Sequence, residues 1–346
     1  MAPESVTIRD VARRAGVSVG TASLALNNRP HISEAKRRKV LQAVTDLGYL
    51  PNVIGKALNR CRCGIIGVVV PVASPPHFPT IVAGINAAAE SQGKPIFVSY
   101  SQDRADIEAR MLKIFQHLYV DGVVLAAAPG RENVSLVRSL MDSGMVIVQV
   151  ERYLPDIRGD FVGSDNRATA YDCTRRLLEK GHRRVGCIMT TYAYSVNDER
   201  YTGYLGALQE AGIEPRPEWM LRLSREDWGA DALQRIRRFL TAPEAPRAVL
   251  SCVSFAEPLL PQVLNEQGWL NGRDVDVVLF DADPAADLGG QPFTIVVQDR
   301  RGMGREAARV LLQRAQEADA QHRTDHRIEL RLPCQETHLT PAIAQR

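Results

Sequence analysis

The spacing of apolar residues changes near residue 64, and this change limits the folds open to the chain. Before it, apolar side chains recur every three or four residues, as in short amphipathic helices. After it, short apolar runs such as Ile65–Val70 alternate with amphipathic stretches. Apolar runs separated by helical patterns are typical of parallel strands with helices on both faces. The sequence therefore predicts a small all-α head followed by an α/β body.

Two series of strands are predicted in the body. They are Ile65–Val70, Pro95–Tyr100, Gly122–Ala128 and Met145–Val150 in the first series, Val185–Met189, Met220–Leu223, Ala248–Val253 and Val275–Phe280 in the second, and a last pattern at Arg327–Leu332. Helical patterns such as Asp198–Ala211 separate them. Two such series predict two doubly wound parallel-sheet lobes. A ligand is expected in a crevice at the carboxyl ends of their strands.

Charge is divided unevenly along the chain. Residues 1–60 carry ten Lys and Arg against four Asp and Glu, whereas the rest carries 33 against 36. A basic head on a mildly acidic body indicates that the head alone meets a polyanion. We find no secretory signal and no apolar run long enough for a membrane, so we expect a cytoplasmic protein. The six scattered cysteines suit reduced thiols better than a disulfide framework.

The head contains three predicted helices. The first runs from a cap at Thr7 and Asp10 to a glycine turn at Gly16, and its apolar stripe is Ile8, Val11, Ala12 and Ala15. Ser18 caps the second, Val19–Leu26, and Ser33 caps the third, Glu34–Leu47, whose Ala35, Val40, Val44 and Leu47 close the core. Two short helices joined by a glycine turn predict a helix-turn-helix, whose second helix enters the major groove of DNA.

Two other kinds of site were weighed against this interpretation. Gly16–Gly20 fits G-x-S-x-G, the nucleophile elbow of α/β hydrolases, but that motif requires a preceding strand and a helix precedes it here. His77, His117 and His182 are not spaced as metal ligands, and Cys61–Cys63 has no second cysteine pair. We therefore expect neither a catalytic site nor a metal or other cofactor. A redox role for Cys61 and Cys63 is left open.

The head resembles the LacI/GalR family of transcriptional repressors. The resemblance is carried by T-I-R-D-V-A-R-R-A-G-V-S-V-G-T-A-S-L-A-L-N-N, Thr7–Asn28, and continues through Ser33–Asn52. It implies base reading by Val19, Gly20 and Leu24. It implies phosphate and neighbouring contacts by Ser18, Thr21, Ser23, Asn27 and His31. The family usually has Arg at the position of Leu24, and Arg reads guanine, so the operator is expected to differ from the common family site.

The segment that follows matches the hinge helix of the same family. It comprises Asn52–Arg60, with Leu58 where the family inserts an apolar wedge into the minor groove. Asn52, Gly55 and Leu58 are therefore assigned to DNA contact. Gly55 stands where Ala is usual and lowers helix propensity by about 1 kcal/mol. A plain linker is the alternative interpretation.

The body is similar to the periplasmic-binding-protein-like core of the same family. Local matches include Ser164–Asn166, Lys180–Val185, Glu199–Tyr204 and Met303–Ala308. The resemblance implies an effector held by charged side chains around an aromatic face, as a polyol requires. The expected effector-binding residues are His77, Phe78, Arg152, Asp165, Arg200, Trp228 and Asp281. The segment around Ser74–Phe78 departs from the family pattern, and a purely structural role for Asp165 and Arg200 is the alternative.

The predicted organisation has three parts. Residues 1–50 form the helix-turn-helix domain, 51–62 the hinge helix and linker, and 63–340 the effector-binding core. Within the core, the N-lobe takes about 63–160 plus 295–322, and the C-lobe about 161–294 plus 323–340. No apolar heptads follow the last strand pattern, so a dimer is expected.

The resemblance implies a nucleoid-associated transcriptional repressor that binds palindromic double-stranded operator DNA and responds to a sugar or related metabolite. It implies allosteric control of a homodimer and no contact with a membrane. The alternatives from other classes are a solute-binding protein and an enzyme that uses the α/β crevice. The sequence leaves open the effector, its inducing or co-repressing action, the operator bases and a higher oligomer.

Overall fold

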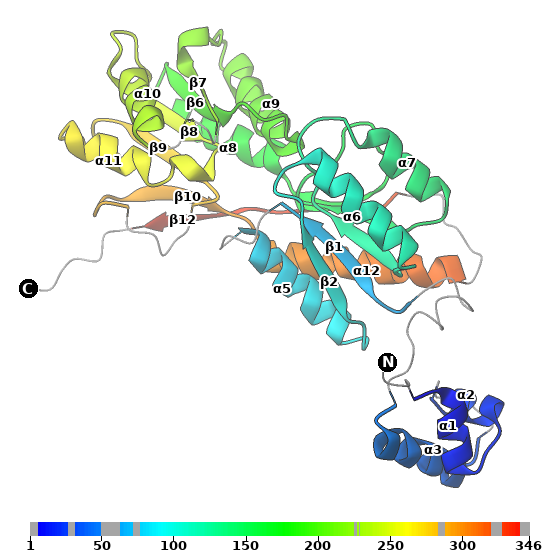
Figure 1. Cartoon of the computed structure of the whole chain (residues 1–346). Helices are drawn as coiled ribbons and strands as arrows, with labels where there is room; N and C mark the ends of the chain where they lie inside the picture. The colour runs from blue at the N-terminus through cyan, green and yellow to red at the C-terminus, as the bar shows by residue number, and fades with distance from the viewer. Residues whose placement is uncertain are drawn as a thin grey trace, which may run out of the picture. The chain divides into compact units, whose positions relative to one another are not determined.

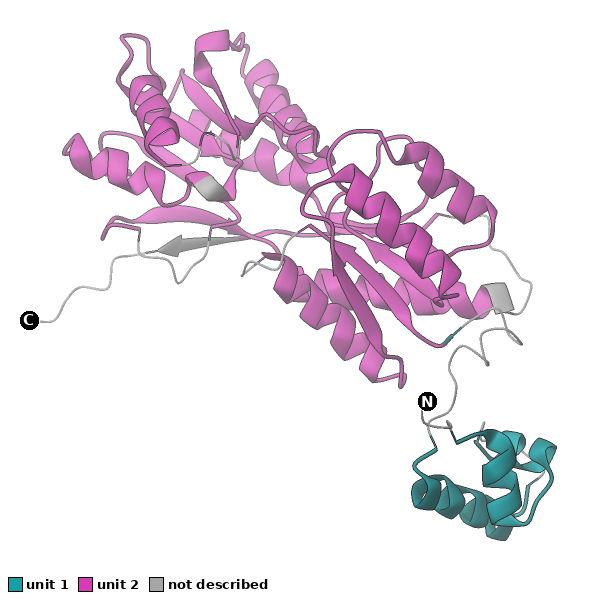
Figure 2. Cartoon of the chain, viewed as in Figure 1, with its two compact units in different colours: residues 1–63 teal, residues 64–346 magenta. Residues whose placement is uncertain are grey.

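The protein was analysed as a computed structural model, and the structure describes residues 6–26, 32–49, 63–71, 77–224, 227, 229–282, 288–319 and 327–339. The chain divides into two compact units, residues 1–63 and 64–346 (Figure 2). Each unit is described by itself below. None of the described helices is long and apolar enough to cross a lipid bilayer.

The first unit is a three-helix head. Its helices are α1 (Ile8–Ala15), α2 (Val19–Leu26) and α3 (Glu34–Leu47), with the bounds that the sequence predicts. Gly16 ends α1 at a φ of +66°, a left-handed conformation that glycine adopts without steric cost. Val11, Ala22 and Val40 are fully buried where the three helices meet. Ala35, expected in this core, is exposed, and Ala43 is buried there instead.

The second unit contains two six-stranded sheets, which define a first and a second lobe (Figure 1). The first sheet has the order β11-β5-β4-β3-β1-β2 and is parallel at every pairing. Its strands are β1 (Ile66–Val70), β2 (Ile96–Tyr100), β3 (Gly122–Leu125), β4 (Ile147–Val150), β5 (Asp160–Ser164) and β11 (Glu329–Leu332). Its helices are α5 (His77–Glu90), α6 (Ala105–His117), α7 (Val134–Asp142) and α12 (Arg300–Asp319).

The second sheet has the order β12-β10-β9-β8-β6-β7, and among its pairings that of β12 with β10 is antiparallel. Its strands are β6 (Val185–Thr190), β7 (Met220–Leu223), β8 (Ala248–Ser251), β9 (Asp276–Phe280), β10 (Phe293–Val297) and β12 (Gln335–Leu339). Its helices are α8 (Asn166–Glu179), α9 (Ser195–Glu210), α10 (Ala230–Thr241) and α11 (Leu259–Glu266), with 3-10 turns at Pro217–Trp219 and Ser254–Ala256.

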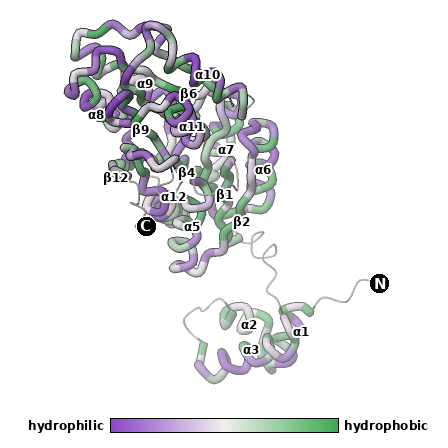
Figure 3. The backbone as a smooth tube through the Cα atoms, turned by 90° about the vertical axis from the view of Figure 1, so that its left-hand side faces the viewer, coloured by the Kyte–Doolittle hydropathy of each residue, from purple (hydrophilic) through white to green (hydrophobic). Residues whose placement is uncertain are grey.

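The inner strands of each sheet are buried on both faces, which accounts for their continuous apolar sequences. All five residues of β1 are buried, and Figure 3 shows hydrophobic residues along β1 and β2 but mainly hydrophilic ones along α3. In the first lobe α5 and α12 pack together, and in the second α8 and α9 do so. The fold is the expected pair of doubly wound lobes.

The chain crosses between the lobes at positions that differ from the predicted ones. The predicted boundary near residue 160 would put residues 161–164 in the second lobe, but they belong to β5 of the first sheet. Likewise β10 belongs to the second lobe and β11 to the first, opposite to the prediction for residues 295–297 and 329–332. The reason is that the chain returns to each lobe to add the last strand of its sheet. Local sequence patterns do not reveal to which lobe such a strand returns.

Candidate functional site

The exposed surface of α2 is the candidate DNA-reading face of the head. The hydroxyl of Ser18 accepts a hydrogen bond from the backbone amide of Thr21 at 3.1 Å, which caps α2 as predicted. Ser18 lies between two helices and not after a strand, so the nucleophile-elbow geometry is absent at this serine. The cap leaves the N-terminal end of α2 at the surface.

Apolar side chains on this face are unusually accessible. Val19 is 44% and Leu24 47% exposed, while Ala22 and Ala25 on the other side of α2 pack into the head. Gly20 and Ser18 are also exposed, and Thr21 and Ser23 are half-buried. The residues expected to touch DNA in α2 therefore share an accessible helix face. Asn27, His31, Asn52, Gly55 and Leu58 lie outside the described residues.

In the second unit, a carboxylate follows an equivalent strand in each lobe. Glu151 comes directly after β4, and Asp281 directly after β9, and these strands hold the same place in the two sheet orders. Both residues have a φ of +61°, a conformation that costs energy for residues other than glycine and often occurs at functional sites. We call the group around these two carboxylates the interlobe site.

Arg200 is the central cation of the interlobe site. It lies on α9, is 3% exposed, and donates hydrogen bonds to the carboxylate of Asp281 at 2.7 Å and to the amide oxygen of Asn166 at 2.7 Å. It also donates to the carbonyl oxygen of Cys252 at 3.0 Å. Burial alone would raise the pKa of Asp281, but Arg200, His77, Arg300 and the hydrogen bond from Gln298 together outweigh it, and the pKa lies well below its usual range. Asp281 is therefore ionised at neutral pH.

Gln298 links the two lobes through the same carboxylates. Its amide nitrogen lies 2.6 Å from Oδ1 of Asp281 and 3.3 Å from Oε1 of Glu151. Nε2 of His77 lies 3.3 Å from that same Oε1. Burial alone would raise the pKa of Glu151, but the interactions with His77 and the charge of Arg200 together outweigh it, so the pKa is lowered. The predicted residues His77, Arg200 and Asp281 are thus in one network.

Arg152 and Phe78 lie together beside this network. The guanidinium of Arg152 lies 5.1 Å from the ring centre of Phe78 and 3.8 Å from that of Tyr194, which precedes α9. It also donates to Asp103 at 2.7 Å. Arg152 is therefore stacked between an aromatic ring of each lobe, a favourable cation–π arrangement.

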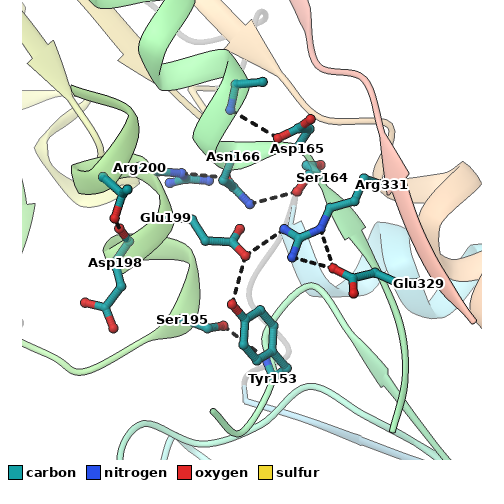
Figure 4. Close-up of polar contacts among 12 residues, drawn as sticks. Tyr153, Ser164, Asp165, Asn166, Ser195, Asp198, Glu199, Arg200, Glu329 and Arg331 are labelled. Carbon is teal, nitrogen blue, oxygen red and sulfur yellow. Dashed lines mark hydrogen bonds and ion pairs between the residues drawn. The ribbon is translucent and has the colours of Figure 1, made fainter. Parts of the chain in front are cut away.

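Asp165 lies at the start of α8. Its carboxylate accepts a hydrogen bond from the amide of Ala168 at 3.1 Å and caps α8 (Figure 4). Its neighbour Asn166, which was not predicted, contacts Arg200. Trp228 lies outside the described residues. Glu151 was also missed, although it follows a buried strand in the same way as Asp281.

Several buried polar atoms at the carboxyl ends of the strands have no hydrogen-bond partner among the described residues. They are Oε2 of Glu151, Oε1 of Gln298, Nε2 of Gln149, Nε of Arg300 and the hydroxyl groups of Ser101 and Ser251. Buried polar groups are almost always paired, so these donors and acceptors require an explanation. A polar ligand that both donates and accepts would supply the missing partners.

Comparisons with known proteins find matches for both the head and the two-lobed unit. A family model for bacterial regulatory proteins of the lacI family matches residues 7–52, and one for a periplasmic binding protein-like domain matches residues 174–333. The transcriptional repressor CytR of Escherichia coli K12 is 30% identical over 320 residues, 90% of each chain. The repressor PurR of Mannheimia succiniciproducens is 26% identical over 319 residues, 92% of this chain and 94% of its own.

Solved structures share the fold. The transcriptional regulator CelR in complex with cellobiose is 27% identical with a TM-score of 0.67. The lac repressor dimer bound to operator and the anti-inducer ONPF is 22% identical with a TM-score of 0.78. Each alignment covers 96% of this chain and 98% of the other.

A helix-turn-helix head joined to a two-lobed sensing core defines a DNA-binding transcriptional regulator controlled by a small molecule. The chain belongs to the LacI family of bacterial regulatory proteins.

Proposed function

We propose that this protein represses transcription as a homodimer that binds a palindromic operator through the exposed face of α2. Relatives that are named as repressors support this proposal, as does the lac repressor, which has been solved as a dimer on its operator. The contacts with DNA are assigned to Ser18, Val19, Gly20, Thr21, Ser23, Leu24, Asn27 and His31 of the head and to Asn52, Gly55 and Leu58 beyond it. A protein of this kind acts at the nucleoid in the cytoplasm.

The effector is proposed to be a small polyol such as a sugar or a sugar-containing metabolite. The observation that carries this assignment is a buried acceptor and a buried donor without partners among the described residues, Oε1 of Gln298 and Nε of Arg300, both on residues that contact Asp281 in the interlobe site. A hydroxyl group both donates and accepts hydrogen bonds, so a polyol matches a site that lacks a donor and an acceptor. The aromatic ring of Phe78 beside Arg152 adds an apolar surface for a sugar ring.

We infer that the interlobe site binds its ligand without transforming it. Its ionised groups already hold one another, since Asp281 is paired with Arg200 and Arg152 with Asp103. Such pairs orient a ligand well, whereas acid–base catalysis needs a group that is poised to exchange a proton. The expected outcome of effector binding is a change in lobe closure, driven by the different affinities of the two states.

The test is operator binding measured by fluorescence anisotropy at several salt concentrations. Counterion release predicts that affinity for a palindromic duplex falls steeply and linearly on a log–log plot as salt rises. A half-site duplex of the same length serves as the control and should bind more weakly. Salt-independent binding, or equal affinity for both duplexes, would contradict the proposal.

Effector binding is tested with a thermal-shift screen of sugars and nucleosides, because a bound ligand raises the melting temperature of the protein by mass action. A true effector should also change operator affinity. The Arg200→Lys variant keeps the charge but loses the planar fork, so it should bind the operator and lose the response. A ligand that acts equally on this variant would show that the assigned site is wrong.

A further inference from the structure

We propose that the interlobe site also holds a divalent transition-metal ion between Glu151, Asp281 and His77, which would join the two lobes. One ligand atom from each of these residues lies within 4.8 Å of the other two. His77 and Glu151 belong to the first lobe and Asp281 to the second. The inference deepens the proposed function, on which it rests, by adding a bridging cation to the regulatory site.

The ligand atoms are close to a coordinating arrangement. Nitrogen and oxygen ligands stand about 2.0–2.2 Å from such an ion, which places neighbouring donors roughly 3–3.5 Å apart. Nε2 of His77 and Oε1 of Glu151 are already 3.3 Å apart. Gln298 holds the same oxygen of Glu151 and Oδ1 of Asp281, so the second lobe needs only a small movement to complete the site.

Oε2 of Glu151 gives independent support for a ligand. Glu151 is 3% exposed, and this oxygen has no hydrogen-bond partner among the described residues. A buried carboxylate is costly unless it is paired or coordinates a metal. Asp281 forms an ion pair with Arg200, and arginine stays protonated in proteins. The partner of Glu151 is the imidazole of His77, which is charged only when protonated. Glu151 is thus the buried carboxylate in this network that has an oxygen, Oε2, available to bind a cation.

The backbone geometry points to the same pair. Glu151 and Asp281 follow equivalent strands, β4 and β9, and both adopt a φ of +61°. The left-handed conformation is uncommon for residues other than glycine, and its repetition places one carboxylate from each lobe at the shared amide of Gln298. Two like charges brought together in this way favour a bridging cation.

The neighbouring arginines limit the affinity and the type of ion. Arg200 pairs with Asp281, and a nitrogen of Arg300 lies 3.7 Å from Oδ1 of the same carboxylate. These positive charges oppose a second cation near Asp281, so His77 and Glu151 would be the principal ligands and binding would be moderate. One nitrogen and two carboxylate ligands suit manganese or zinc better than calcium, which prefers oxygen alone.

Manganese(II) is the appropriate probe, because it avoids the thiols of the second lobe. Electron paramagnetic resonance of full-length, chelator-treated protein would follow the loss of the free-ion signal during titration. We expect one bound ion per chain, and binding weaker by more than about tenfold in the Glu151→Gln variant. If the Glu151→Gln variant does not fold, His77→Gln takes its place in the experiment. It removes a half-buried ligand and should weaken manganese binding to the same extent.

The matched control is His182→Gln. His182 forms a similar histidine–carboxylate pair with Asp276 at 2.5 Å, but Lys180 already occupies the other oxygen of that carboxylate. This variant should bind manganese as the unaltered protein does. No binding at millimolar manganese, or equal binding by all variants, would overturn the proposal. Operator affinity measured in chelator tests the proposed function separately, so the two can fail independently.

Discussion

At the scale of single residues, the first lobe contains a carboxyl group in an unusual environment. Glu108 on α6 is fully buried and accepts hydrogen bonds from the amide of Ala128 at 2.6 Å and from Asn133 at 2.8 Å. Burial raises its pKa in spite of these bonds, with the charges of Asp103 and Arg152 nearby. Glu108 therefore fixes the loop after β3, where that strand ends at the ligand-facing edge of the sheet.

Glu108 makes the stability of the core depend on pH. Since the folded-state pKa is raised above the unfolded value near 4.5, the carboxyl contributes most stability below about pH 4.5 and loses it as the pH rises through the folded pKa. Glu108→Gln cannot titrate. Urea denaturation gives the free energy of unfolding of both proteins. The stability of the unaltered protein relative to the variant should therefore fall as the pH rises above 4.5. A difference that rises over this range would contradict the assignment.

Part of the interlobe site could be predicted from the sequence, because some of its residues stand in local sequence patterns that can be recognised. Asp281 and Arg200 stand at the end of a buried strand and in a family-like helix segment, both of which can be recognised without the fold. Glu151 and Gln298 could not be assigned in this way, because their roles depend on the meeting of β4, β9 and β10 from two sheets. The contact of Asn166 with Arg200, next to the cap that Asp165 forms, also depends on backbone geometry that the sequence does not reveal.

At the scale of elements, glycines set how closely helices pack. A Cβ atom added at Gly203 on α9 would lie 2.2 Å from the carbonyl oxygen of Arg167 on α8. In the first lobe, a Cβ at Gly84 on α5 would lie 2.2 Å from the carbonyl oxygen of Arg301 on α12. Since α9 carries Arg200, the packing at Gly203 also positions the interlobe site.

The Gly203→Ala variant should separate α8 from α9. The contact is with backbone, which cannot move aside like a flexible side chain, so we expect a loss of about 1–3 kcal/mol. Gly206→Ala on the same helix is the control, because its Cβ would meet Tyr171 at an ordinary 3.6 Å. That change should be neutral or stabilising by up to about 1 kcal/mol. Thermal unfolding of both variants provides the comparison, and equal melting temperatures would refute the close-packing argument.

The cap of the recognition helix α2 gives a second prediction at this scale. Ser18→Ala removes the hydroxyl that accepts from the amide of Thr21, at a cost of about 1 kcal/mol in the head. Ser33 stands before α3 without a side-chain cap bond, so Ser33→Ala should cost little. Hydrogen exchange of the head amides would measure both. An equal loss of protection in the two variants would show that the cap has no specific role.

Element boundaries were predicted well where periodicity was strong and poorly where it was weak. The three head helices have the predicted bounds because capping residues and glycines mark their ends. The strand β5 was missed because Asp160, Gly163 and Ser164 resemble a loop, although four of its five residues are buried. Strand β12 was missed because the first four residues of Gln335–Leu339 are all polar, as an edge strand allows but a loop also does.

At the scale of the whole sensing unit, a polar cluster joins the lobes apart from the interlobe site (Figure 4). Glu199 on α9 accepts hydrogen bonds from the hydroxyl of Tyr153 at 2.9 Å and from Arg331 on β11 at 2.6 Å. The amide of Tyr153 donates to the hydroxyl of Ser195 at 3.0 Å. Glu199 therefore connects the second lobe to two segments of the first.

Glu199→Gln should weaken the contact between the lobes. The change removes the charge that binds Arg331, and part-buried hydrogen bonds to charged groups contribute about 1.5–3 kcal/mol. Small-angle scattering should then report a larger radius of gyration for the ligand-free protein. Glu329→Gln is the control, because Glu329 pairs with the same arginine from within β11. Equal scattering by the two variants would mean that Glu199 does not hold the lobes together.

The crossings after β5, after β10 and after β11 give neither lobe a continuous stretch of chain. The first lobe receives α12 and β11 only after nearly the whole second lobe has left the ribosome. The DNA-reading head, by contrast, emerges complete at the start of synthesis. During translation a nascent chain would thus expose an operator-binding module well before any module able to regulate it, and a nonsense mutation upstream of α12 would release a head that no metabolite could govern.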